Sequence, residues 1–320
     1  MGMVHPVIAV DLGGTNLRCA VVDGDGAVIS RATAATPAEA GPEAVLDLLV
    51  GMMDAAAAGA GLSGQAPAGL AMPGPLDPRR QIVAKMPNLA GWREFPVGDA
   101  LRRRTDRPFA LGNDGNCAAL GEAAFGAARG VEDLVHLALG TGIGGGVISG
   151  GRLIDGARGY GAEVGHVVVA TDGPRCSCGA VGCVESFAAG WALARDADLV
   201  ARTDDGAAIR AACTGGTATV AALIAAAEAG DGAALAILDR AGQAVGAALG
   251  GFLNLFNPEM VTIGGGVGER AWDLLLPTLR RSLASHSFSQ CRENLRIERS
   301  ELGDDAGLLG AAALARQAPR

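Results

Sequence analysis

The sequence predicts an α/β fold that contains one unit twice, and two stretches of the chain carry this prediction. Residues 7–30 read VIAVDLGGTNLRCAVVDGDGAVIS, and residues 134–154 read LVHLALGTGIGGGVISGGRLI. Each stretch has three strand-like apolar runs separated by glycine-containing turns, as in a three-stranded meander. Segments with helical spacing fill the rest of the chain. Because glycine turns are generic, two unrelated hairpins are the alternative to a duplication.

Four segments are predicted to be helices. Residues 42–59 have apolar residues at helical spacing, and residues 115–130 open beside an Asn-Asp pair after a short strand. Residues 234–258 are a long apolar segment that ends at Asn-Pro, and residues 307–316 form the last helix. Before that helix, residues 259–269 are expected to give a strand and a glycine-rich turn.

Composition limits the classes of function. The net charge of −8 and the isoelectric point near 5.1 argue against nucleic acid as the main partner. The chain has no uninterrupted run of about 18 apolar residues, so no membrane-spanning helix is expected. The first residues lack a basic region ahead of an apolar one, so we expect a cytoplasmic protein. Cysteines stay reduced in that compartment, where clusters of them more often bind metal or catalyse than form disulfides.

Any phosphate-binding site in this chain must differ from the lysine-containing P-loop. Lys85 is the only lysine, so no GxxxxGK[ST] motif exists. The stretch GTGIGG at 140–145 matches the dinucleotide pattern GxGxxG, but about one such match is expected by chance in a chain with 50 glycines. A strand-like segment follows it, whereas a dinucleotide site requires a helix there. We therefore exclude a Rossmann site.

The glycine turns themselves can hold phosphate, because tight turns between strands expose backbone N–H groups. Asp11, at the end of an apolar strand, is a plausible anchor for hydrated Mg²⁺. Ordinary hairpin glycines are the alternative for either turn. The candidate nucleotide-binding residues of the two turns are Asp11, Gly13, Gly14, Thr15 and Asn16, and Thr141, Gly142, Gly144 and Gly145.

The most specific pattern is C-x-C-x4-C, formed by Cys176, Cys178 and Cys183. With 7 cysteines in 320 residues, about 0.003 such matches are expected by chance. Three thiolates and the imidazole of His166, ten residues upstream, make a tetrahedral set suited to Zn²⁺. A site closed by four protein ligands is structural, so the zinc would brace the loop and take no part in the chemistry. A disulfide or a cysteine nucleophile is the alternative.

The motifs DLGGTNLR, GNDGNCAALGEA, LGTGIGGGVISGGRL, EVGH and CSCGAVGCVES resemble, in order and spacing, those of the ROK family of sugar kinases and repressors. The resemblance is greatest to its bacterial glucokinases and runs from residue 7 to about 310. It implies a two-domain actin-like ATPase fold, of the duplicated ribonuclease H-like type, with sugar and nucleotide between the domains. We expect a small domain of residues 1–114 plus the C-terminal helix at about 303–320. Residues 115–302 would form the large domain, with the zinc-binding loop at 166–183.

The resemblance also implies roles for single residues. Asp114 would be the catalytic base and Asn113 a sugar ligand, whereas the residues alone favour a helix cap at Asp114. Glu163, His166 and Glu185 would bind hexose hydroxyls, and His166 would serve zinc and sugar through different ring nitrogens. The backbone of Gly74 would close on the sugar. The adenosine would lie against Gly264, Gly265 and Gly266.

The implied function is ATP-dependent phosphorylation of glucose at O6, with ATP, Mg²⁺ and structural Zn²⁺ bound. The family suggests a homodimer or homotetramer, with no nucleic-acid or membrane partner. The alternatives are a kinase for N-acetylglucosamine, N-acetylmannosamine, fructose or mannose, or a sugar-responsive transcription regulator of the same family. A regulator is disfavoured because the first strand is expected by about residue 7, which leaves no room for a helix-turn-helix region. A polyphosphate donor is disfavoured because the chain lacks a basic track.

Overall fold

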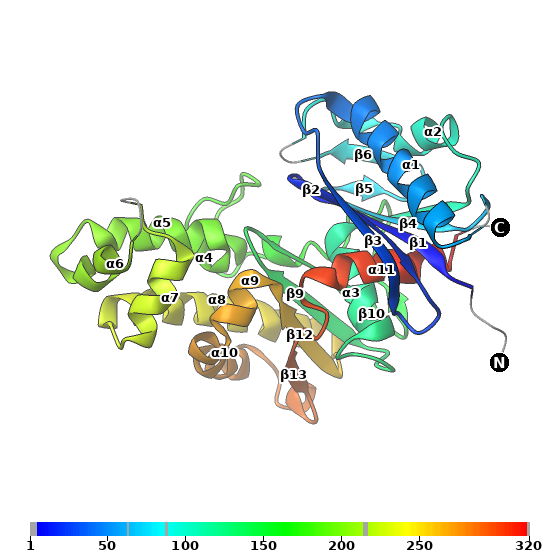
Figure 1. Ribbon diagram of the computed structural model, residues 1–320. Helices are drawn as coiled ribbons and strands as arrows, with labels where there is room; N and C mark the ends of the chain where they lie inside the picture. The colour runs from blue at the N-terminus through cyan, green and yellow to red at the C-terminus, as the bar shows by residue number, and fades with distance from the viewer. Residues whose placement is uncertain (1–4, 63, 87–88, 214–216, 319–320) are drawn as a thin grey trace. The chain divides into compact units, whose positions relative to one another are not determined.

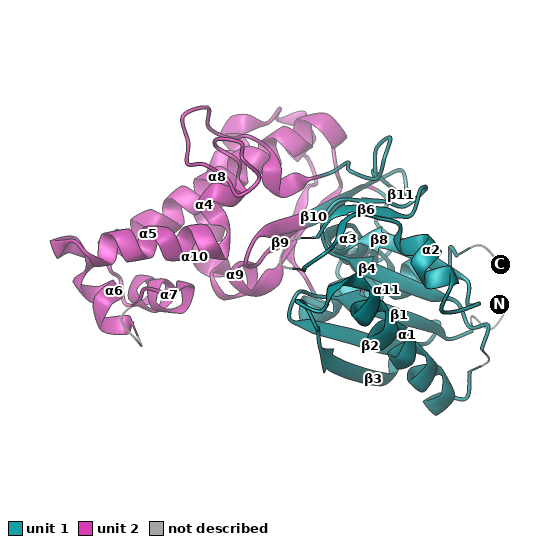
Figure 2. Cartoon of the chain, turned by 90° about the horizontal axis from the view of Figure 1, so that it is seen from above, with its two compact units in different colours: residues 1–132, 145–162, 301–320 teal, residues 133–144, 163–300 magenta. Residues whose placement is uncertain are grey.

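The computed structural model describes residues 5–62, 64–86, 89–213 and 217–318, and it confirms the α/β class (Figure 1). The chain forms two compact units, which Figure 2 shows in different colours. Unit 1 comprises residues 1–132, 145–162 and 301–320, and unit 2 comprises residues 133–144 and 163–300.

The main sheet of unit 1 has the order β3-β2-β1-β4-β8. Its strands are β1 (Val7–Leu12), β2 (Asn16–Val22), β3 (Val28–Ala35), β4 (Ala68–Met72) and β8 (Phe109–Asn113). The first three strands are antiparallel neighbours, so the predicted meander is confirmed, and β4 and β8 run parallel to β1. A second, three-stranded sheet consists of β5 (Leu76–Asp77), β6 (Ile82–Lys85) and β7 (Arg93–Phe95).

Helices cover both faces of the main sheet of unit 1. The predicted helix at 42–59 is α1 (Gly41–Gly59), which packs with Ile8 and Val10, and the predicted last helix is α11 (Ala306–Ala315), which packs with Ala9. Successive side chains of a strand point to opposite faces, so a strand buried on both faces is apolar throughout. This explains the apolar run of β1 from Val7 to Val10, ahead of Asp11. The short helix α2 (Val97–Arg102) completes the unit on the side of α1.

The helix that follows β8 packs closely against the C-terminal helix. Helix α3 (Asp114–Phe125) packs along α11, and a Cβ at Gly310 would lie 1.6 Å from the carbonyl oxygen of Cys117. Only glycine permits this backbone approach. The predicted helix at 115–130 is therefore confirmed, but it ends at Phe125. Helix α3 belongs to unit 1 in the structure, and the predicted domains of residues 1–114 with 303–320 and of residues 115–302 stay a prediction.

The second five-stranded sheet repeats the plan of the first, with the order β11-β10-β9-β12-β13. Its strands are β9 (Leu134–Leu139), β10 (Ile143–Ser149), β11 (Arg152–Leu153), β12 (Met260–Gly264) and β13 (Arg296–Arg299). As in the first sheet, the third, second and first strands of a meander are followed by two later strands parallel to the first. The predicted duplication is confirmed. A strand also follows the glycines at 140–142, in agreement with the exclusion of a Rossmann site.

The helices of unit 2 follow the cysteine-rich loop. They are α4 (Glu185–Ala188), α5 (Gly190–Ala201), α6 (Ala207–Ala212), α7 (Val220–Glu228), α8 (Gly232–Phe256), α9 (Gly265–Arg270) and α10 (Trp272–His286). Helix α8 begins where Asp231 accepts a hydrogen bond from the backbone of Ala234 and ends at Asn257, whose φ of 44° is left-handed. The helix predicted at 234–258 is confirmed. Helices α8 and α10 pack against each other.

Among the described helices, none reaches by itself the length and hydropathy of a membrane span. The pair α7 and α8 reaches them only when the two are taken together, and the pair bends by 113° at its break.

Candidate active site and metal centre

Asp11 lies at the β1–β2 hairpin and is fixed by an arginine of the facing strand. The hairpin register places Asp11 directly opposite Arg18. The Arg18 guanidinium donates to the Asp11 Oδ2 atom from Nη2 at 2.5 Å and from Nε at 3.1 Å. Asp11 is only 8% exposed, and this burial raises the pKa of its carboxyl while Arg18 opposes the rise. Arg18 therefore stabilises the charge that a Mg²⁺ anchor needs.

A second contact of Arg18 links the hairpin to the start of α11. Its Nη1 donates to the Asp304 carbonyl at 2.8 Å, and Asp305 forms an ion pair with Arg31 at 2.6 Å. Arg18 was absent from the predicted site residues. The sequence signal for it was the hairpin itself, because a tight turn after Asp11 brings the residue seven positions later beside it.

The turn between β1 and β2 exposes the groups predicted to hold phosphate. Gly14, Thr15 and Asn16 are exposed, and the Gly13 N–H is used within the turn, where it donates to the Asn16 carbonyl at 2.9 Å. The Thr36 hydroxyl donates to the Gly13 carbonyl at 2.7 Å and holds the turn to the end of β3. The structure thus brings Asp11 and residues 13–16 together in one hairpin.

The second hairpin turn comprises only Gly140, Thr141 and Gly142. Gly144 and Gly145, expected in the turn, lie in β10, because the Gly140 N–H already closes the turn on the Gly142 carbonyl at 2.9 Å. Thr141 is exposed at the tip. The start of α5 packs on this turn, where the Gly190 N–H donates to the Gly140 carbonyl at 2.8 Å.

Asn113 and Asp114 lie where β8 ends and α3 begins. The Asn113 side chain is the N-cap: its Oδ1 accepts from the Asn116 N–H at 3.1 Å. Asp114 is therefore not needed as the cap, and its exposed carboxylate stands in the first turn of α3. The positive end of the helix dipole favours the ionised form of a carboxylate there.

The amide of Asn113 also orients its neighbours. Its Nδ2 donates to Asp114 Oδ1 at 3.0 Å and to the carbonyl of Gly74 at 3.2 Å. Gly74 has a φ of 82°, a conformation that L side chains rarely adopt. The structure therefore places three of the predicted sugar-side residues, Gly74, Asn113 and Asp114, in one hydrogen-bonded group.

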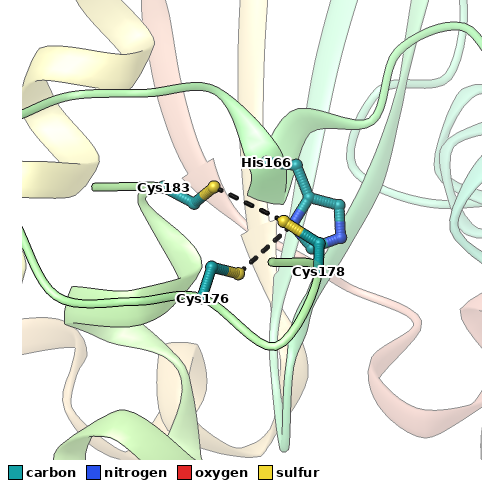
Figure 3. Close-up of side chains that lie close together, drawn as sticks. All are labelled: His166, Cys176, Cys178 and Cys183. Carbon is teal, nitrogen blue, oxygen red and sulfur yellow. Dashed lines mark hydrogen bonds between the residues drawn. The ribbon is translucent and has the colours of Figure 1, made fainter. Parts of the chain in front are cut away.

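The predicted metal ligands come together in unit 2. Single ligand atoms of His166, Cys176, Cys178 and Cys183 all lie within 4.8 Å of one another (Figure 3). The Cys178 and Cys183 sulfurs are 3.8 Å apart, and the Cys176 sulfur is 3.6 Å from His166 Nδ1. A tetrahedral zinc with ordinary bond lengths needs separations of about 3.8 Å between sulfurs and about 3.6 Å between sulfur and nitrogen. The donor set therefore fits zinc.

The loop geometry explains how such short spacing closes. An isolated antiparallel β-bridge pairs Val168 with Cys183, and the Gly179 N–H donates to the Cys176 carbonyl at 3.0 Å. Gly182 has a φ of 75°, and a Cβ there would lie 1.6 Å from the Ala170 carbonyl oxygen. The glycines flanking the cysteines are thus required by the fold of the loop.

Glu185 is tied to this loop and to the second hairpin. Its Oε1 accepts from the Ser177 hydroxyl at 2.9 Å, and its Oε2 accepts from the Ile143 N–H at 3.0 Å. A Cβ at Gly142 would lie 2.9 Å from Glu185 Oε2, which explains the glycine. Ser177 was not predicted as part of the site. A carboxylate oxygen can accept two hydrogen bonds, so Glu185 keeps acceptor capacity for a ligand.

Glu163 and His166 bracket a single turn of 3₁₀ helix ahead of the cysteines. The His166 N–H donates to the Glu163 carbonyl at 3.0 Å. Partial desolvation of its carboxyl group raises the pKa of Glu163, the charge of His166 lowers it and that of Glu185 raises it. Because His166 Nδ1 faces the cysteine sulfurs, Nε2 is the nitrogen left for another partner.

The glycines predicted to receive adenosine do not form the expected turn. Gly264 ends β12, and Gly265 and Gly266 open α9. Gly265 has a φ of 80°, and a Cβ there would lie 2.5 Å from the Leu139 carbonyl oxygen. The strand runs directly into a helix because these glycines let α9 pass close to β9.

The chain is similar along nearly its whole length to sugar kinases of known sequence and structure. The glucokinase of Thermotoga maritima is 37% identical over 313 residues, which cover 97% of each chain. A ROK hexokinase from Thermus thermophilus has a TM-score of 0.84 and 39% identity, with 98% of both chains covered. A ROK family glucokinase from Streptomyces griseus, solved with glucose and AMPPNP, has a TM-score of 0.78 and 35% identity over 98% of this chain and 99% of that one. An N-acetylmannosamine kinase from Shigella flexneri is 30% identical over 97% of this chain and 98% of the relative.

The repeated sheet order and these structural neighbours define the class as the actin-like ATPase fold. Within that class a family model matches residues 7–318, and the chain belongs to the ROK family.

Proposed function

We propose that the protein is an ATP-dependent hexose kinase that phosphorylates glucose at O6, giving glucose 6-phosphate and ADP. The observation that carries the proposal is the match, along nearly the whole chain, to ROK glucokinases, one of them solved with glucose and an ATP analogue. The ionisable carboxylate of Asp114 at the start of α3, oriented by Asn113, supports the chemistry.

Asp114 acts as the general base in this proposal. Its carboxylate takes the proton of the sugar O6 hydroxyl as that oxygen attacks the γ-phosphorus of ATP. A bond from O6 to phosphorus forms, and the bond from phosphorus to the bridging oxygen of ADP breaks. Asn113 holds the carboxylate in place through its Nδ2 and binds the sugar. Positioning by such fixed groups supplies much of the rate in phosphoryl transfer.

Sugar hydroxyls are bound by the backbone at Gly74 and by Glu163, Glu185 and His166 Nε2. The carboxylates accept hydrogen bonds from adjacent hydroxyls, and the imidazole donates or accepts. We propose that residues 1–114 with 303–320 and residues 115–302 are the parts that close on the bound sugar and exclude water.

The nucleotide is held by the two hairpins and by the β12–α9 junction. Backbone N–H groups of the exposed turn residues 14–16 and of Thr141 and Gly142 bind phosphate oxygens, because the Gly13 N–H is used within its turn and Gly144 and Gly145 lie in β10. Asp11 anchors hydrated Mg²⁺, and Gly264, Gly265 and Gly266 receive the adenosine. Mg²⁺ would neutralise charge on the phosphates. Zn²⁺ at His166, Cys176, Cys178 and Cys183 would brace the loop that ends at Glu185. We propose a cytoplasmic homodimer or homotetramer with no nucleic-acid or membrane partner.

The proposal is tested by measuring ADP release with a panel of hexoses and donors. We expect the highest kcat/KM with glucose and ATP. The panel includes N-acetylmannosamine, N-acetylglucosamine, fructose and mannose, because the match to an N-acetylmannosamine kinase favours that sugar as the second candidate. A higher kcat/KM with another sugar would replace glucose as the substrate, and no ADP release with any sugar would reject the kinase.

Arg18 is expected to position Asp11 for the metal. In Arg18→Gln the buried carboxylate loses both guanidinium bonds, so we expect activity at limiting Mg²⁺ to fall about 10- to 100-fold. The Mg²⁺ concentration for half-maximal rate should rise, and Arg18→Lys should restore only part, because lysine offers a point charge instead of a fork. Arg31→Gln, which loses its pair with Asp305, is the control. An unchanged Mg²⁺ requirement with lowered thermal stability would show a purely structural role.

A further inference from the structure

Unit 2 contains a pocket of about 540 Å³ that none of the proposed catalytic groups uses. Two helix faces form its walls. Residues 240, 243, 244 and 247 project from α8, and residues 278, 281, 282, 285 and 286 from α10, each set at the spacing of one helical face. Val169, Ala170 and Phe187, from the cysteine-rich loop and α4, complete the lining. We call this cavity the α8–α10 pocket.

The lining is basic in a chain of net charge −8. It includes Arg240, Arg281 and His286 and no carboxylate. Arg240 lies 3.6 Å from Asp196, but Asp196 also pairs with Arg195 at 2.7 Å, so one carboxylate serves two guanidinium groups. Positive charge is therefore left over at the pocket.

Arg281 meets a carboxylate only indirectly. It donates to the Thr278 hydroxyl at 2.7 Å, which in turn donates to Asp239 Oδ1 at 2.5 Å, and within the described part of the chain Arg281 forms no direct ion pair with a carboxylate. His286 Nδ1 lies 2.7 Å from the Ser282 carbonyl and donates to it, so in the neutral imidazole Nε2 is an acceptor. The donors that suit an anion are therefore the guanidinium groups of Arg240 and Arg281.

The rest of the lining is mixed: Gln243, Thr278, Ser282 and Ser285 are polar, and the other side chains are apolar. Val169, Phe187, Ala244 and Ala247 offer no hydrogen-bonding side chain. A ligand that matches both parts therefore has a phosphate or carboxylate group joined to an apolar body. Phosphate with a planar guanidinium is a favourable pairing, since the guanidinium can donate two parallel bonds.

One wall of the pocket is the outer side of the metal-binding loop. The Val169 N–H donates to the Gly182 carbonyl at 2.8 Å, next to Cys183, and Phe187 packs on Gly173 of the same loop. Phe187 also follows Glu185 by two residues. A ligand in the pocket would press on the segment that carries Glu185 and the cysteines.

We propose that the α8–α10 pocket binds a small organic anion and that its occupancy changes the affinity of the protein for sugar. The second half rests on the proposed function, because it takes Glu163, His166 and Glu185 as sugar ligands. Coupling between sites is reciprocal, so sugar should change the affinity for the anion by the same factor.

The test uses phenyl phosphate as the probe in calorimetric titrations of the full-length, zinc-containing protein. We expect phenyl phosphate to bind about tenfold more tightly than phenol or inorganic phosphate, since only phenyl phosphate meets both parts of the lining. Arg281→Gln and Arg240→Gln should each weaken its binding about tenfold. Arg202→Gln removes an equal charge from the exposed pair with Asp198 on α5 and should leave it unchanged.

Equal affinity in all three variants, or no binding of phenyl phosphate at 10 mM, which is about the weak end of useful affinities, would overturn the site. If the probe fails to bind and Arg281→Gln turns a dimer into a monomer by light scattering, a second copy of the chain occupies the pocket and the proposal is wrong.

Saturating phenyl phosphate should shift the glucose Kd about fivefold. An unshifted glucose Kd would overturn the coupling. Absence of glucose binding would contradict the proposed function instead, because the titration with phenyl phosphate needs no sugar.

Discussion

Asp114→Asn is expected to lower kcat about 1,000-fold while changing the glucose Kd less than about threefold. A positioned general base contributes about 10²- to 10⁴-fold to rate, and asparagine has nearly the same shape but cannot take the O6 proton. The Asn113 amide, which caps α3 through its own oxygen, does not depend on Asp114, so the helix start should survive the change. The measurements are the steady-state rate of ADP release and calorimetric titration with glucose.

Asp99→Asn is the matched control for this variant. Asp99 is an exposed carboxylate of the same unit, at the start of α2, where it pairs only with the exposed Arg102. Its replacement should leave both kcat and glucose binding unchanged. If Asp114→Asn kept more than about a tenth of the kcat, Asp114 would not be the base. If it abolished glucose binding as well, its main role would be to hold sugar.

The fold was predictable because its signals are local. Strand-like segments rich in apolar residues, separated by glycine turns, give β1, β2 and β3 of the first meander, and the same signals give β9, β10 and β11. The resulting sheet orders match, as the duplication requires. The Asp231 cap and the Asn257-Pro258 stop likewise fix both ends of α8 by local chemistry.

The errors arose where glycine serves packing. Gly144 and Gly145 were predicted in a turn but lie in β10, and Gly265 was predicted in a turn but begins α9. A glycine needed because another backbone passes close looks the same in the sequence as a glycine needed for a turn. Only the three-dimensional neighbours, such as the Leu139 carbonyl beside Gly265, distinguish them.

The sequence best predicted which site residues lie together when they belong to a single loop or hairpin. The Cys176, Cys178, Cys183 and His166 cluster was predicted from spacing, and the structure brings its four ligand atoms together. The partners of Glu185 could not be predicted the same way, since the Ile143 N–H lies 42 residues away along the chain. Outside the cluster, Cys19 and Cys117 are buried, and Cys213 and Cys291 are half-buried.

Loss of zinc is expected to destabilise unit 2 without removing the proposed general base, Asp114, which belongs to unit 1. We expect about one zinc per chain by metal analysis of the purified protein, as one set of four ligands requires. Cys178→Ser is the informative variant, because Cys178 is exposed and its replacement disturbs little packing. We expect this variant to lose the metal and about 3 kcal/mol of stability, a fall in Tm of about 6–12 °C for a unit of this size.

The cause of that fall can be isolated with a chelator. A ligand that binds only the folded state stabilises it, so removing zinc from the wild type should lower its Tm to that of Cys178→Ser, and the variant should not respond to chelation. Cys291→Ser, at a half-buried cysteine outside the cluster, should keep both metal and Tm.

Below the lowered Tm, kcat at saturating glucose should stay within about threefold of wild type while KM rises, because Asp114 is intact and the loop carrying Glu185 is loosened. A wild-type protein without zinc, or a Cys178→Ser protein that keeps its metal, would show that the cluster is not a zinc site. A kcat that vanished together with the metal would show that the ion takes part in the reaction.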